Sequence, residues 1–203
     1  MAKNTNSGEV DWNEAGSAGK TEYMRLQQND NIVRVMDKPI MVYVHWIDTA
    51  GGKKAKIVSP TQNPALVDRI VNAGFPQKQS YYLRVLDREN SEKEPSFKIL
   101  EVGPQIINQL KDLIKNKRYG TLEKYDVNIK KGAKGSNPLY TVIPEGKVPN
   151  TPEELKAYKE WNSNIDIERF SRPAPDEKIL EMLGLKEEEE DSGSGTDDFD
   201  FES

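Results

Sequence analysis

The sequence predicts a mainly β fold, a small barrel of five or six strands with an inserted helix, followed by C-terminal helices and flanked by disordered ends. Short runs that alternate apolar and polar residues recur between residues 30 and 143, as expected for half-buried strands. One long apolar stripe with helical spacing interrupts these runs. Of the 203 residues, 35% are hydrophobic and 31% are charged, a lean composition that indicates unfolded segments.

Charge divides the chain into a basic body and an acidic tail. Residues 187–203 contain nine acidic residues and no Lys or Arg, whereas residues 1–186 contain 29 basic and 25 acidic residues, a net charge of +4. Gly, Ser, Asn and Ala are frequent at the N-terminus. We therefore expect a flexible arm over 1–22, a barrel domain over 23–150, a helical segment over 151–186 and a disordered acidic tail after it.

The first half of the predicted fold is rich in strands. In order, we expect strands Ile32–Met36 and Ile40–Trp46, a Gly51-Gly52 turn with a basic return strand Lys53–Val58, a helix Asn63–Gly74, and strands Tyr81–Leu86 and Phe97–Val102. Alternation along the second strand places Trp46 with the apolar residues, so we expect it in the core, and places Tyr43 and His45 on the opposite face.

The second half begins with the clearest helix of the chain. Pro104 suits the first helical turn, an apolar stripe runs from Ile106 to Ile114, and Gly120 ends the pattern. We then expect a strand Leu122–Lys130, a basic loop Lys131–Asn137, a return strand Pro138–Ile143, and helices Thr151–Trp161 and Asp176–Leu183. This order fits an oligonucleotide-binding (OB) type barrel, and a β-sandwich is the alternative fold.

Motifs of common catalytic sites are missing from the sequence. It has no P-loop, no Gly-x-Ser-x-Gly and no His-Glu-x-x-His, and with no Cys and a single His, His45, it offers no thiolate or histidine-rich metal site. A metal-dependent nuclease is a distant alternative, because the acids between Asp48 and Asp112 form no recognisable cluster. We expect no enzyme, no cofactor, no metal and, without a run of about 18 apolar residues, no membrane span.

Aromatic and basic residues are interleaved on the predicted non-core faces and hairpin loops. Single-stranded nucleic acid is held by a basic groove for its phosphates and by aromatic planes on which bases stack. The residues that provide this mixture are Tyr43, His45, Tyr82, Arg84, Lys53, Lys54, Lys56, Lys130, Lys131 and Lys134.

Two hairpins carry a more specific pattern. The early one reads Ile-Val-Arg-Val-Met, then Lys-Pro, then Tyr-Val-His-Trp, and the later one reads Tyr-Asp-Val-Asn-Ile, a Lys/Gly-rich loop and Leu-Tyr-Thr-Val-Ile-Pro. Over about residues 30–145 the chain resembles the single-stranded DNA-binding, helix-destabilising proteins of tailed phages. The resemblance implies an OB-type barrel, and DNA contacts by Arg34, Tyr43, His45, Trp46, Lys131 and Tyr140. Some of these phage proteins carry a cysteine-rich zinc element after the His-Trp strand, and this chain, without cysteine, implies no zinc.

The acidic tail contains aromatic residues that a purely solubilising tail does not need. Its relevant residues are Asp197, Asp198, Phe199, Asp200 and Phe201. Such a peptide suits docking into a basic-rimmed apolar pocket on a partner, and it resembles the tail of bacterial single-stranded DNA-binding proteins, which implies recruitment of replication and recombination proteins. A tethered acidic tail can also compete with DNA for a basic groove.

We therefore expect a sequence-tolerant single-stranded DNA-binding protein that acts in phage DNA replication, recombination or repair, in the cytoplasm of the host cell. The alternative is a non-enzymatic factor that binds a polymerase and whose acidic tail mimics DNA, since the body carries only +4. RNA as a ligand, the oligomeric state and the roles of Trp12 and of helix 151–161 stay open.

Overall fold

The computed structural model describes residues 23–49, 51–91 and 94–185, which form two compact units. Unit 1 runs to Val44 and from Gln77 to Arg172, and unit 2 comprises His45–Pro76 and the chain from Pro173 onward. Helix 151–161 therefore belongs to unit 1 and helix 176–183 to unit 2. The expected N-terminal arm with Trp12 and the acidic tail lie outside the described residues.

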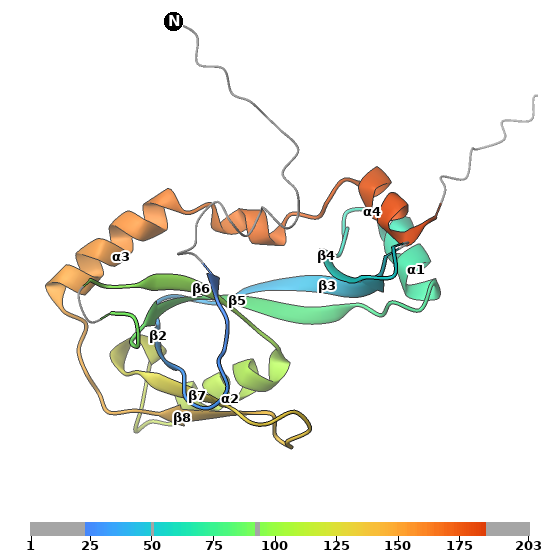
Figure 1. Ribbon diagram of the computed structural model, residues 1–203. Coiled ribbons are helices and arrows are strands. Elements are labelled where there is room, and N and C mark those ends of the chain that lie inside the picture. Colours follow the sequence, from blue (N-terminus) through green and yellow to red (C-terminus); the bar gives the residue numbers. More distant parts are fainter. Residues whose placement is uncertain (1–22, 50, 92–93, 186–203) are drawn as a thin grey trace, which may run out of the picture. The chain divides into compact units, whose positions relative to one another are not determined.

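Unit 1 is built on a curled, open sheet, so the fold is mainly β (Figure 1). The strands pair in the order β1-β6-β5-β2-β7-β8, with β3 on a second branch beside β5. All these pairs are antiparallel except β1 with β6. The strands are β1 (Tyr23–Met24), β2 (Ile32–Val35), β3 (Ile40–Asp48), β5 (Lys78–Asp87), β6 (Phe97–Val102), β7 (Val127–Lys131) and β8 (Tyr140–Pro144).

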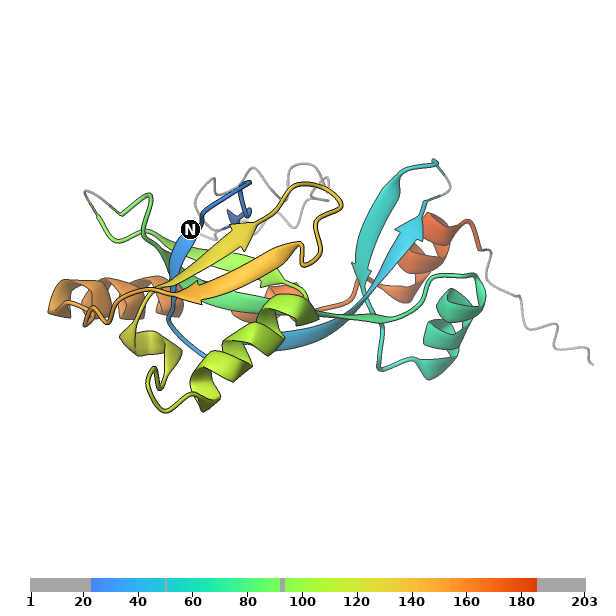
Figure 2. The same cartoon turned by 90° about the horizontal axis from the view of Figure 1, so that it is seen from below.

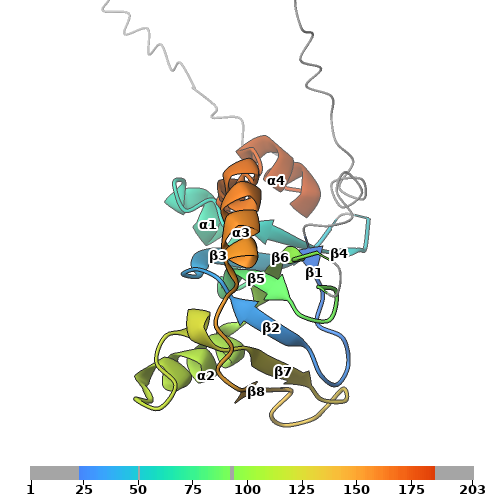
Figure 3. The same cartoon turned by 90° about the vertical axis from the view of Figure 1, so that its left-hand side faces the viewer.

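Helices cover both faces of this sheet, with α2 (Pro104–Lys115) on one face and α3 (Pro152–Asn164) on the other (Figure 3). The apolar stripe of α2 buries Ile106, Ile107 and Leu110 in the main core against residues of β2, β5 and β7. On the opposite face, aromatic residues of α3 and of the 3₁₀ helix η2 (Ile167–Ser171) pack on β5 and β6. Because β5 is central and both of its faces are covered, seven of its last eight residues are buried.

Unit 2 consists of a two-stranded ribbon and two helices (Figure 2). The end of β3 pairs with β4 (Lys54–Val58), and α1 (Pro64–Asn72) and α4 (Asp176–Leu183) pack against the ribbon. The core of this unit contains Ile47, Ile57, Leu66, Ile70, Ile179 and Leu180. Asn63 caps α1 by accepting from the Leu66 N–H at 3.2 Å, and its Nδ2 donates to Asp176 at 2.8 Å, which joins the two helices.

Most predicted elements are confirmed, but the start of one strand and the burial of Trp46 differ from the prediction. The expected strand Leu122–Lys130 begins with a 3₁₀ helix, η1 (Leu122–Lys124), and only then continues as β7, because Leu122 packs under α2. Trp46, expected in the core, is 53% exposed. The buried parity of β3 changes between Val44 and His45, where the strand passes from unit 1 into unit 2.

Among the helices of the described ranges, none has the length and apolar character needed to cross a membrane.

Candidate nucleic-acid interface

The β7–β8 hairpin brings four of the predicted residues together in unit 1. Lys131 lies opposite Tyr140 in the strand register, Lys130 is the next residue on β7, and the loop beyond carries Lys134. Lys130 and Lys134 are exposed, whereas Lys131 and Tyr140 are half-buried. This hairpin therefore presents Lys130 and Lys134 to solvent, whereas Tyr140 packs against the main core and the Nζ of Lys131 donates to the Leu26 carbonyl oxygen at 3.2 Å.

A buried asparagine network holds the neighbouring loop against this hairpin. The Nδ2 of Asn31 donates to the carbonyl oxygens of Gln27 and Ile129, at 3.0 and 2.8 Å, and Asn29 and Lys131 exchange both backbone hydrogen bonds. The same loop places Asp30 at 3.2 Å from the Nζ of Lys130. Bonds from Asn128 and then Lys130 lower the pKa of Asp30, so this acid is ionised and offsets part of the hairpin charge.

The ribbon of unit 2 carries a second combination of aromatic and basic side chains. Ile47 and Ile57 of this ribbon point into the core of unit 2, so alternation places Trp46, Lys54 and Lys56 on its outer face. Lys53 stands beside them at the turn, where the Thr49 N–H donates to the Lys53 carbonyl oxygen at 2.8 Å. Trp46 is thus a half-exposed ring on the same face as Lys54 and Lys56, with Lys53 at the adjoining turn.

His45 does not share this outer face. It is fully buried, with Nδ1 at 2.8 Å from the Phe75 carbonyl oxygen and Nε2 at 2.9 Å from the Ser59 Oγ. Since a carbonyl oxygen only accepts, Nδ1 carries a proton, and Nε2 shares a hydrogen bond with the Ser59 hydroxyl, which can donate or accept. Both ring nitrogens are satisfied, and His45 holds the ribbon of unit 2 to its neighbouring loops.

Arg34 is fully buried in an ion network of unit 1. Its Nε lies 2.8 Å from Asp126, and its Nη1 donates to Asn150 at 2.6 Å. Arg88 forms ion pairs with the same Asp126, at 3.1 Å, and with Glu154. Burial opposes the ionisation of Glu154, but the bonds from Arg88 and from the Thr151 N–H outweigh it and lower its pKa. The network ties the N-terminal end of α3 to β2 and to Asp126, the residue before β7.

Tyr82 and Arg84 are covered by the C-terminal segment of unit 1. The ring of Tyr82, only 3% exposed, lies 5.2 Å from that of Phe170 and 6.5 Å from that of Tyr23. Arg84 forms an ion pair with Asp37 at 3.0 Å and donates to Asn162 at 3.0 Å. The expectation that this strand face is open is wrong, because α3 and η2 occupy it.

Tyr43 keeps partial access. It is half-buried and lies on the face of β3 opposite the buried Val42 and Val44, next to Met41, which is 46% exposed. Tyr43 pairs with the exposed Gln79 of β5. The structure thus groups Lys130, Lys131, Lys134 and Tyr140 in unit 1 and Lys53, Lys54, Lys56 and Trp46 in unit 2, while Tyr43 stands on β3.

Sequence reasoning missed the exposure of Trp46 and the buried roles of Arg34 and His45. A signal for Trp46 is present in the sequence, because Ile47 follows it and competes for the inward face. The predicted tail residues Asp197, Asp198, Phe199, Asp200 and Phe201 lie outside the described residues.

Comparison with known proteins gives no match, whether with family models, curated proteins or solved structures. Within the part of the chain that the structure describes, no group of three or more His, Cys, Asp or Glu side chains is placed to hold a metal ion.

Proposed function

We propose that the protein binds single-stranded DNA without sequence preference. The contacts are the β7–β8 hairpin, with Lys130, Lys131, Lys134 and Tyr140, and the outer face of the unit 2 ribbon, with Trp46 and Lys53, Lys54 and Lys56. The role that follows is to hold strands open and protected during replication, recombination or repair in the cytoplasm. Arg34, His45, Tyr82 and Arg84 are not part of the proposed interface, because they are buried or covered.

The exposed ring of Trp46 is the single observation that supports this proposal most. Its ring is 53% exposed on the outer face of the ribbon, whereas Ile47 and Ile57 on the other face are buried in the core of unit 2. The three lysines around it supply charge for phosphates, and the flat ring supplies a surface on which any base can stack.

The strand order supports a finer fold proposal, an OB-type barrel left open on one side. Five strands follow the order β6-β5-β2-β7-β8, and α2 separates β6 from β7 in the chain, as in a five-stranded OB barrel. Pairing of β6 with β8 would close it. In this description, the part of unit 2 from His45 to Pro76 is an insertion between β2 and β5, which pair with each other.

An oligo-dT titration tests the function. We expect saturable binding with quenching of Trp fluorescence, and a log–log salt slope of about −0.7 for each phosphate neutralised. The variant Lys53→Gln/Lys54→Gln should flatten that slope by about 1.4, since two contacts are lost. The matched control is Lys156→Gln/Lys159→Gln on α3, which makes the same charge change with exposed residues and should leave the slope unchanged.

The absence of oligo-dT binding at low salt would overturn this function. In that outcome, retention of a polymerase by the full chain would favour the alternative, an interaction factor whose acidic tail mimics DNA.

A further inference from the structure

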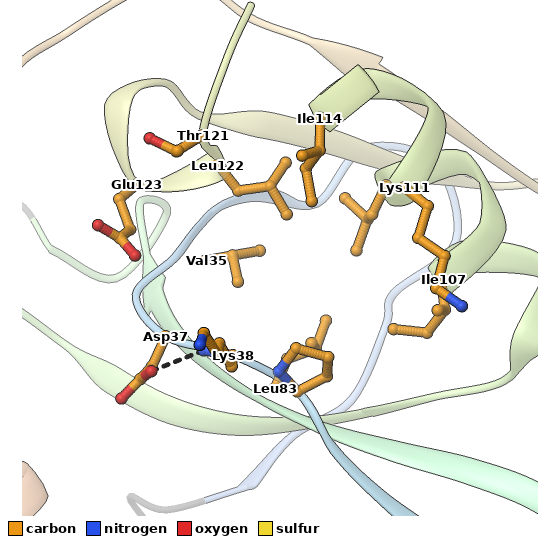
Figure 4. Close-up of a pocket in the computed structure, with 12 residues that line it drawn as sticks. Val35, Asp37, Lys38, Leu83, Ile107, Lys111, Ile114, Thr121, Leu122 and Glu123 are labelled. Carbon is orange, nitrogen blue, oxygen red and sulfur yellow. Dashed lines mark hydrogen bonds between the residues drawn. The ribbon is translucent and has the colours of Figure 1, made fainter. Parts of the chain in front are cut away.

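Unit 1 contains an apolar cavity that the proposed DNA contacts do not use. It measures about 250 Å³ and opens between α2, η1 and the strands β2 and β5. Figure 4 shows side chains from all four elements around it. Buried Val35, Leu83 and Leu110 belong to the main core, and Leu122 from η1 adds a further apolar wall.

The last turn of α2 carries an apolar side chain at the cavity edge that no other element covers. The helical stripe continues from Leu110 to Ile114, but Ile114 is 48% exposed at the cavity edge. The sequence therefore extends the apolar surface beyond what the sheet covers. A cavity of this size is below the range of about 300–1,000 Å³ usual for sites of drug-sized ligands, and it suits one large side chain of a peptide.

The opening carries charges of both signs. Lys38 and Lys111 stand at the rim with Asp37 and Glu123, and the neighbouring segment 111–124 carries five basic and two acidic residues. Of the acids at the rim, Asp37 is already paired with Arg84 at 3.0 Å, which leaves Glu123. The surroundings therefore favour an acidic ligand.

The lining argues against nucleic acid as the occupant. Its apolar side chains are aliphatic, with no aromatic ring on which a base could stack. An acidic peptide with an aromatic anchor matches both the apolar interior and the basic rim.

We propose that this cavity binds the acidic segment Asp197–Ser203 of this same protein, with Phe199 or Phe201 as the inserted side chain. The segment contains four acidic residues, no basic residue and two phenylalanines one residue apart. It lies outside the described residues and follows Leu185 through residues 186–196 of the same chain. The cavity is thus the protein's own docking site for its tail, a role separate from DNA binding.

Methyl NMR of the full-length protein, without DNA, tests this proposal. We expect the Ile107, Ile114 and Leu122 methyl signals to differ between the unmodified protein and the variant Phe199→Ala/Phe201→Ala, which keeps every tail charge. A synthetic peptide of residues 197–203, added to that variant, should restore the original signals in a saturable manner.

A second pair of variants locates the site. Ile114→Glu removes an apolar edge and adds a like charge, and it should weaken peptide binding by about tenfold or more. Leu155→Glu on α3, where the leucine is 44% exposed, makes the same change away from the cavity and should have no effect. Identical methyl signals with and without the phenylalanines, or equal peptide affinity for both Glu variants, would overturn the proposal. Because no DNA is present, such a failure is distinguishable from a failure of the proposed function.

Discussion

Residues of the same type have different roles in this protein because their surroundings differ. Arg34 and Lys134 both fit a basic DNA-binding pattern, yet Arg34 is fully buried against Asp126 and Lys134 stands exposed in a loop. Trp46 and Trp161 differ likewise, since Trp161 packs on Phe97 with ring centres 5.7 Å apart. Burial converts Arg34 and Trp161 into parts of the fold and leaves Lys134 and Trp46 available for a ligand.

Trp46→Ala should weaken binding to oligo-dT by roughly 5- to 150-fold, because a stacked base contributes about 1–3 kcal/mol. Trp46→Phe should retain most of the affinity, since it keeps an aromatic plane. Fluorescence anisotropy with labelled oligo-dT measures both. Equal affinity of the Ala variant and the unmodified protein would exclude Trp46 as a stacking residue.

Glu154→Gln should destabilise unit 1 near neutral pH by about 1–3 kcal/mol, because Arg88 loses a charged partner in a half-buried site. The pKa of Glu154 is lowered below its ordinary 4.5, so its contribution is present above that value and is lost as the pH falls through the lowered pKa. The stability difference between variant and unmodified protein should therefore shrink at acidic pH. Urea unfolding at several pH values measures it, and a difference independent of pH would contradict the assignment.

At the scale of elements, side chains far away in sequence complete the edges and faces of strands. β8 is the end strand of the sheet order, and its outward backbone groups are satisfied by α2. The Nε2 of Gln109 donates to the Tyr140 carbonyl oxygen at 3.0 Å, and its Oε1 accepts from the Val142 N–H at 2.8 Å. One amide side chain thus substitutes for a neighbouring strand, which protects the edge from pairing with another chain.

Gln109→Ala should lower the free energy of unfolding by about 1–3 kcal/mol, because two edge groups lose their partners. It should also increase self-association, since the edge of β8 becomes available for pairing. Gln105→Ala, an exposed residue one turn earlier on α2, is the matched control. Thermal unfolding and light scattering measure the two effects, and identical behaviour of both variants would show that the edge does not depend on Gln109.

At the scale of the whole molecule, charge is separated along the chain. The nine acids of residues 187–203 are tethered to a body with a net charge of +4. When the tail binds the basic hairpins, it competes with the phosphates of DNA. This competition weakens as salt screens the attraction of the lysines for the tail and for DNA.

Deleting residues 187–203 should therefore tighten oligo-dT binding, most clearly at low salt. The variant Phe199→Ala/Phe201→Ala keeps all nine acids and separates competition by charge from docking by the aromatic rings. Anisotropy titrations at two salt concentrations measure the effect. Equal affinity of the full-length and shortened proteins at low salt would show that the tail does not compete.

Local patterns in the sequence suffice to predict most of the helices and strands. Pro104 at the start of α2 and the start of α3 at Thr151 and Pro152 depend on neighbours within a few residues, so a single sequence reveals them. Lys53, Lys54, Lys130 and Lys134 are exposed as predicted, because charged side chains stay in water unless a partner buries them.

Which strand faces stay open to solvent depends on tertiary contacts. Tyr82 is covered by Phe170, 88 positions later in the chain, and Trp46 faces outward because Ile47 and His45 satisfy the interior of unit 2. Strand alternation defines two faces but does not say which face is covered, since that depends on elements distant in sequence. The cavity beside Ile114 has the same origin, because it exists only where α2, η1 and the sheet meet.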